Sequence, residues 1–208
     1  MKTKSPLSIR IIYWFTNVIL GLLSLISVAV IVFNILLYTS FFGNDLQLHS
    51  QLPVEVNFLE MGNLNLNGQD IKVELVEATS RIHFFNTPIF LAKIFGLALL
   101  LALSFIVSIM WTFRKFIVNV KNGRTFNIAN IKLLKRLAYI MTGLWFYTVL
   151  YNYSFYYYIA TKLEFEYISI SKETQDHGSI LVIALFIWVL AHIFISGLKL
   201  QEEQDLTI

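Results

Sequence analysis

Side chains that could do chemistry are few in this chain of 208 residues, and their spacing forms no catalytic motif. There is no cysteine, which removes disulfides, thiol nucleophiles and thiolate metal sites. The HExxH, GxxxxGK[ST] and GxSxG patterns are also missing. His49, His83 and His177 have acidic neighbours in sequence, but their irregular spacing favours a solvated surface over a metal site. We therefore expect no enzyme, no cofactor and no metal.

Polar residues inside long apolar runs are the second kind of candidate, because polar and ionisable groups are costly at membrane depth. Asn17, Asn34, Asn152 and His192 lie in such runs. They could line a polar cavity or carry a proton, although simple packing is favoured since no acidic residue accompanies the histidine. Lys93 lies about one turn from the end of its run, where its stem can reach the membrane surface.

The apolar runs themselves indicate a membrane protein. The chain is 57% hydrophobic and only 14% charged, which excludes a soluble domain of this size. Uncharged runs at residues 11–38, 94–113, 137–161 and 178–198 each reach the roughly 20 residues that cross a bilayer as a helix. The first run follows basic residues, as in a signal peptide, but it is too long and lacks a cleavage site. We expect it to be a retained anchor.

The predicted fold is mainly α, a polytopic membrane protein with four transmembrane helices and a small external antiparallel β module. Its segments are a cytoplasmic N-terminus (1–10), a first span (11–38), an external β-rich segment (39–88), a second span (89–113), a basic cytoplasmic loop (114–136), a third span (137–161), an external loop (162–177), a fourth span (178–198) and a cytoplasmic tail (199–208).

The orientation follows from positive charge, which concentrates in cytoplasmic loops. Residues 114–136 hold seven basic side chains and no acid: Arg114, Lys115, Lys121, Arg124, Lys132, Lys135 and Arg136. Residues 39–88 hold two basic residues against six acids. We therefore predict that both termini are cytoplasmic.

The long external segment alternates apolar and polar residues near 54–58, 64–66 and 71–75, the period of a half-buried strand. Met61-Gly62 and Asn67-Gly68 fall between these stretches, and Asn-Gly favours a hairpin turn. We predict three antiparallel strands, to which the second external loop could add a strand or a lid. Thr87 and Pro88 are placed as the cap and first turn of the next helix.

The basic loop contains the most informative stretch. Gly123 is expected to end one helix and Asn127 to cap the next. Lys132, Lys135 and Arg136 share one helical face, which favours contact with anionic lipid headgroups and leaves protein recognition as the alternative. Direct nucleic-acid binding is not expected. The acidic tail 199–208 is either a disordered end or a segment that docks on a partner.

Two motifs in these segments resemble a known family. The loop reads G-x-x-F-N-x-x-N-I-x-x-L over Gly123–Leu134, and the tail reads G-x-x-L-x-E-E-x-D-L-T-I over Gly197–Ile208. Together they resemble the bacterial four-helix membrane family catalogued as domain of unknown function 2975, over essentially the whole chain. The resemblance implies a bacterial cytoplasmic membrane location and no specific activity. Members are often encoded beside a small helix-turn-helix transcription regulator, which implies such a regulator as partner.

The leading hypothesis is a non-enzymatic sensory or regulatory membrane protein. Its candidate partner-binding residues are Phe126, Asn127, Asn130, Lys132, Lys135, Arg136, Glu202, Glu203, Asp205, Leu206 and Thr207. The alternatives are a transport-associated or peptide-immunity protein, which needs a polar cavity in the bilayer, and a subunit of a larger membrane complex. Homo-oligomer formation is left open.

Overall fold

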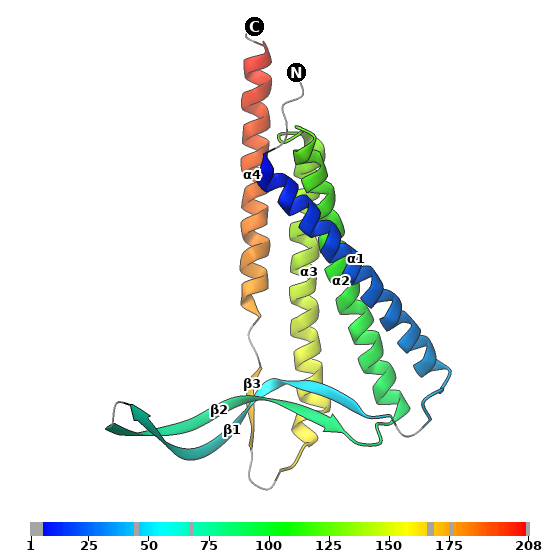
Figure 1. Cartoon of the computed structure of the whole chain (residues 1–208), viewed down its shortest axis with the longest axis vertical. Helices are drawn as coiled ribbons and strands as arrows, with labels where there is room; N and C mark the ends of the chain where they lie inside the picture. Colours follow the sequence, from blue (N-terminus) through cyan, green and yellow to red (C-terminus); the bar gives the residue numbers. More distant parts are fainter. Residues whose placement is uncertain (1–5, 44–45, 67–68, 166–168, 175–176, 207–208) are drawn as a thin grey trace. The chain divides into compact units, whose positions relative to one another are not determined.

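The computed structural model describes residues 6–43, 46–66, 69–165, 169–174 and 177–206. The elements follow the order α1 (Leu7–Tyr38), β1 (Leu48–Leu66), β2 (Gln69–Phe84), α2 (Ile89–Lys121), α3 (Ile128–Tyr158), a 3-10 turn (Ala160–Lys162), β3 (Ser169–Thr174) and α4 (Gly178–Leu206) (Figure 1). They form two compact units. The helical unit comprises residues 1–41, 93–147 and 177–208, and the sheet unit comprises residues 42–92 and 148–176.

Among the described residues, α1, α2 and α4 are long and apolar enough to cross a membrane, and α3 is not. Length and composition therefore support three of the four predicted spans, and the third predicted span, in α3, does not meet them. The third helix is uncharged after Arg136, but tyrosine, threonine and asparagine lower its apolar character. Its tyrosines are Tyr139, Tyr147, Tyr151, Tyr153, Tyr156, Tyr157 and Tyr158. The three helices have the lengths and compositions that a bilayer requires, which indicates a membrane protein.

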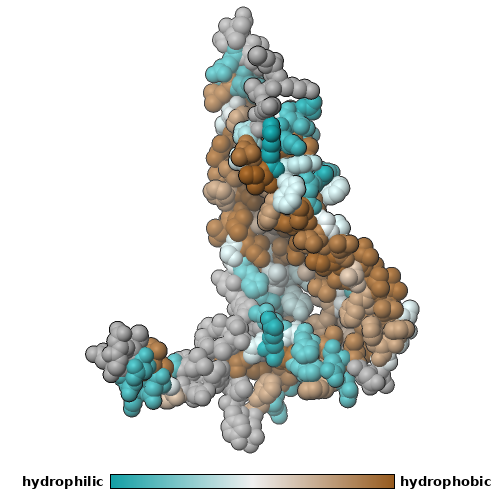
Figure 2. All heavy atoms as spheres, viewed as in Figure 1, coloured by the Kyte–Doolittle hydropathy of each residue, from teal (hydrophilic) through white to brown (hydrophobic). Residues whose placement is uncertain are grey.

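The surface of α1 carries the lipid-facing character that this assignment needs. Large aliphatic residues such as Leu22, Leu25 and Ile35 are exposed along it, and the ribbon labelled α1 in Figure 1 is covered by apolar side chains in Figure 2. Only four of its residues are buried, namely Thr16, Leu20, Asn34 and Leu37. A helix this apolar all round would be insoluble in water, whereas lipid solvates it.

The sheet has three antiparallel strands in the order β2-β1-β3. The prediction of three antiparallel strands is right in number, but the strands differ. Met61 and Gly62 lie within the long strand β1, opposite Glu74 and Val73, and form no turn. The third strand comes instead from the second loop, as β3 pairs with β1 at residues 54–57. The predicted Asn67-Gly68 turn lies outside the described residues.

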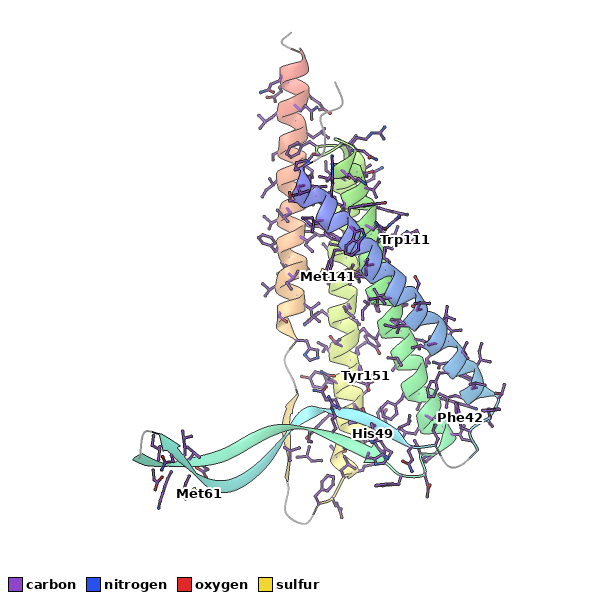
Figure 3. All side chains as sticks on the ribbon, viewed as in Figure 1. Phe42, His49, Met61, Trp111, Met141 and Tyr151 are labelled. Carbon is purple, nitrogen blue, oxygen red and sulfur yellow. The ribbon has the colours of Figure 1, made fainter. Side chains whose placement is uncertain are left out.

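Alternation along β1 and β2 separates an inner face from an outer face near the start of the hairpin. Ser50 is half-buried, and its side chain hydrogen-bonds Tyr151 of α3. His49 faces the opposite way, and its ring stacks on His83 of β2 with the centroids 3.9 Å apart (Figure 3 labels His49 and Tyr151). The ladder shifts register between Gln51 and Glu55, around Pro53, because proline has no N–H to donate.

The entry to α2 differs from the sequence prediction in one detail. The carbonyl of Pro88 accepts the first helical hydrogen bond, from Ala92, as expected for a helix that starts here. Thr87 does not cap the helix with its side chain. Its hydroxyl donates to the carbonyl of Phe84, and its backbone N–H donates to the carbonyl of Leu46. Thr87 therefore fastens the end of β2 to the chain before β1.

Candidate functional site at the α2–α3 loop and α4

The loop between α2 and α3 begins with a hydrogen-bonded stop. Gly123 has a φ of +79°, in the left-handed region where glycine is unstrained. The N–H of Gly123 donates to the carbonyl of Val120, and the N–H of Arg124 donates to that of Asn119. This pair of bonds is the Schellman motif, which satisfies the last carbonyls of a helix. The prediction that Gly123 ends the helix is confirmed.

The loop ends with two asparagines that have different tasks. Asn127 is the cap of α3, because its side-chain oxygen accepts from the N–H of Asn130 at 2.7 Å. The side chain of Asn130 reaches back, and its amide nitrogen donates to the carbonyls of Arg124 and Thr125. Its amide oxygen accepts from Asn119 of α2 at 2.8 Å. Asn130 is 0% exposed, so it holds the loop closed and offers no side chain to a partner.

Phe126, at the tip of the loop, packs against α4. Its ring centroid lies 5.1 Å from that of Phe194, which in turn lies 5.9 Å from that of Phe116 in α2. A Cβ atom built on Gly197 would lie 2.8 Å from Cε1 of Phe126. Because glycine has no side chain, the ring of Phe126 can occupy the space next to Gly197. We name these four residues the aromatic seat; it joins α2, the loop and α4.

The charged residues predicted to bind a partner follow Phe126 on α3 and Gly197 on α4, and most of them are exposed. Lys132 and Arg136 are exposed and Lys135 is half-buried, while the other face of α3 buries Ile131 and Leu134. In α4, Glu202 and Glu203 are exposed. The helix continues through Leu206, so the segment predicted as a tail extends α4. The side chains of Asp205 and Leu206, and Thr207 as a whole, lie outside the described residues.

Helices α1 and α2 approach each other closely at two polar residues of α1, Asn17 and Asn34. At one level, the Nε of Arg114 donates to the side-chain oxygen of Asn17 at 2.6 Å. At the other level, Asn34 is 4% exposed and its side-chain oxygen has no hydrogen-bond partner among the described residues. A Cβ on Gly96 would lie 2.5 Å from that oxygen, so glycine is needed there for α1 and α2 to approach.

The polar residues in the apolar runs do not gather into one cavity within the helical unit. Asn17 and Asn34 are 17 positions apart on α1, which is about 25 Å along a helix. His192 is exposed, and its Nδ1 donates to the carbonyl of Trp188, one turn back in the same helix. Asn152 belongs to the sheet unit, where it is buried. Asn17, Asn34 and His192 therefore lie in separate environments and do not form a common polar site.

Sequence reasoning missed the residues that connect the two motifs. Gly197 was identified only as the first position of the tail motif, with no structural role, and neither Phe116 nor Phe194 was predicted to belong to a site. A usable signal existed, because a glycine inside a membrane helix often marks close approach of another group. The sequence could not identify Phe126 as that group, since it lies 71 positions away.

Comparison with known proteins supports the family resemblance. Residues 69–208 match the family described as "Protein of unknown function (DUF2975)", and this range includes both motifs. No curated protein and no solved structure matches the chain.

Proposed function

The chain belongs to this family of unknown function, DUF2975, and we propose that it is a non-enzymatic regulatory membrane protein that presents the α2–α3 loop and α4 to a cytoplasmic protein partner. The aromatic seat is the observation that carries the proposal. It brings the segments 123–134 and 197–206 together although they are far apart in sequence. A surface built from two segments changes when α4 moves against the loop, so a partner can read the state of the membrane helices.

The proposed topology has four crossings, and the argument for the fourth is connectivity. Along the chain, strand β1 comes after α1 and before α2, and strand β3 comes after α3. The two strands nevertheless pair with each other in one sheet. If α2 crosses the bilayer, the chain after it must cross back to reach that sheet. We therefore propose that α3 also crosses the membrane, despite its tyrosines.

The contacts of α3 with α2 support such a crossing. The hydroxyl of Tyr147 donates to the carbonyl of Ala98 at 2.7 Å, which satisfies a polar group that lipid could not. Gly143 lies against Phe105, whose Cε1 would be 3.1 Å from a Cβ at that position. In the proposal, α3 crosses as a helix shielded by α2, with both termini and the α2–α3 loop in the cytoplasm. The positive charge of residues 114–136 favours that orientation.

A small helix-turn-helix transcription regulator is the partner that we propose, on the genomic association of the family. The surface offers such a protein both signs of charge, with Lys132 and Arg136 exposed on α3 and Glu202 and Glu203 exposed on α4. Charges arranged in this way steer a partner and fix its register more than they add affinity. The bilayer itself is the second partner in the proposal.

The test is copurification from native membranes with three forms of the tagged chain: wild type, G197A and G21A. Gly21 is the matched control, because a Cβ at that position meets nothing within 4 Å. We expect a helix-turn-helix regulator to copurify with the wild type and with G21A, and to be depleted with G197A. Equal recovery with all three forms, or copurification of a transporter subunit in its place, would overturn the proposal.

A further inference from the structure

The depth of Arg114 in the bilayer follows from the charges of α2. Between Lys93 and Arg114 lie 20 residues, from Ile94 to Phe113, and none of them is charged. Twenty helical residues rise about 30 Å, which is the thickness of the hydrocarbon core. Arg114 and Lys115 are therefore the first charges beyond the hydrocarbon at one end of α2, at the depth of lipid phosphates.

The guanidinium of Arg114 is held in a fixed orientation. Its Nε donates to the side-chain oxygen of Asn17, whose amide nitrogen donates to the carbonyl of Tyr13 in the same helix. This uses one edge of the guanidinium and leaves the paired Nη groups on another edge. Neither Arg114 nor Lys115 has an acidic partner among the described residues. Two Nη groups in a plane match two oxygens of a phosphate.

Trp111, labelled on α2 in Figure 3, precedes these cations by three and four positions, about one helical turn. Its ring centroid is 5.9 Å from Cζ of Arg114 and 5.5 Å from Nζ of Lys115. Its side chain is 49% exposed. An exposed tryptophan beside two cations has an apolar ring for lipid and holds the cations near one another.

We propose that Arg114 and Lys115, with Trp111 below them, form a binding site for the headgroup of one anionic phospholipid. The phosphodiester accepts from the Nη groups of Arg114 and from Nζ of Lys115, and the acyl chains descend past Trp111. Asn17 is a positioning residue that aims the guanidinium. A phospholipid fits better than a soluble anion because the uncharged run Ile94–Phe113 of α2 ends directly at the two cations, and Trp111 within that run exposes its apolar ring. The site does not depend on the proposed protein partner.

The experiment measures lipid retention by native mass spectrometry of the detergent-purified full chain, titrated with phosphatidylglycerol or phosphatidylcholine. R114Q/K115Q removes the two cations. K121Q/R124Q is the matched control, since it removes one lysine and one arginine farther along the same end of the chain. N17D keeps an oxygen acceptor for Nε of Arg114, and hence the contact between α1 and α2, but neutralises the site.

We expect phosphatidylglycerol to bind R114Q/K115Q about 30-fold more weakly than wild type, equivalent to about 1 kcal/mol for each cation. N17D should weaken the same lipid, and K121Q/R124Q should bind within about threefold of wild type, which is under about 0.7 kcal/mol. An equal loss with K121Q/R124Q would show diffuse attraction and overturn the site. Equal retention of phosphatidylcholine, or displacement of the lipid by inorganic phosphate at the same concentration, would do so as well.

Discussion

Replacing Gly197 by alanine is the sharpest test of the aromatic seat, because two opposing effects can be separated. Alanine favours a helix over glycine by about 1 kcal/mol where the new methyl has room. G21A should therefore stabilise α1 by up to this amount, since nothing lies within 4 Å of that Cβ. At Gly197 the methyl would lie 2.8 Å from Cε1 and 2.9 Å from Cδ1 of Phe126.

The ring must move away for the methyl to be in van der Waals contact, which begins at about 3.5 Å between carbon atoms. Phe126 can move, since it is 43% exposed, but it then loses its packing on Phe194. Aromatic pairs contribute about 0.5–1.5 kcal/mol beyond the area they bury. G197A should therefore be about 1–2 kcal/mol less stable than G21A, although the chemical change is the same.

The assay is a double-mutant cycle of F126A with G197A, with the free energy of unfolding measured by SDS titration in dodecylmaltoside micelles. With the ring removed, the methyl at Gly197 meets no obstacle. G197A should then become as favourable as G21A, giving a coupling of about 1–2 kcal/mol between the two positions. Additivity within about 0.5 kcal/mol would refute the reasoning, because residues that do not touch behave in this way.

Two further predictions address the membrane crossing and the loop. Since the chain has no cysteine, single cysteines introduced at Asn122 and Thr161, which are both exposed, report on the two ends of α3. An impermeant maleimide should label T161C in intact cells but N122C only after permeabilisation. Labelling of both variants in intact cells would show that α3 does not cross the membrane. In the same SDS titration, N130A should lower the free energy of unfolding by about 3 kcal/mol, because three hydrogen bonds of a buried side chain are lost. N127A should lower it by about 1 kcal/mol, the usual effect of a lost helix cap. Equal losses would contradict the separate roles of the two asparagines.

The helix boundaries show which parts of the fold local sequence can predict. Gly123 and Asn127 act through bonds to residues within a few positions, so their spacing was sufficient to predict a stop and a cap. Met61-Gly62 misled because β1 continues through it, paired residue by residue with β2 from Glu60 to Leu66. Glycine permits a turn but does not require one, and strand pairing over a longer distance overrode the local signal.

The candidate partner-binding site stays a prediction, and the structure shows where its residues lie. The motifs located the α2–α3 loop and the end of α4 as the segments to examine. Asn130 was assigned to the partner-binding surface because it is a position of the loop motif, but its amide hydrogen-bonds two carbonyls of the loop and the side chain of Asn119 in α2. The buried position depends on where Arg124 and Thr125 turn their carbonyls, which no residue pattern specifies.

The sequence by itself determined that three helices are long and apolar enough to cross a membrane, because hydrophobicity and charge act through composition and need no knowledge of contacts. It also determined the family, through two short motifs. Only the tertiary structure decided that the motifs meet, with Phe126 lying where a side chain at Gly197 would be. The physical reason is that close packing depends on the relative position of two segments far apart in the chain, and a glycine reveals the absence of a side chain without naming the group that fills its place.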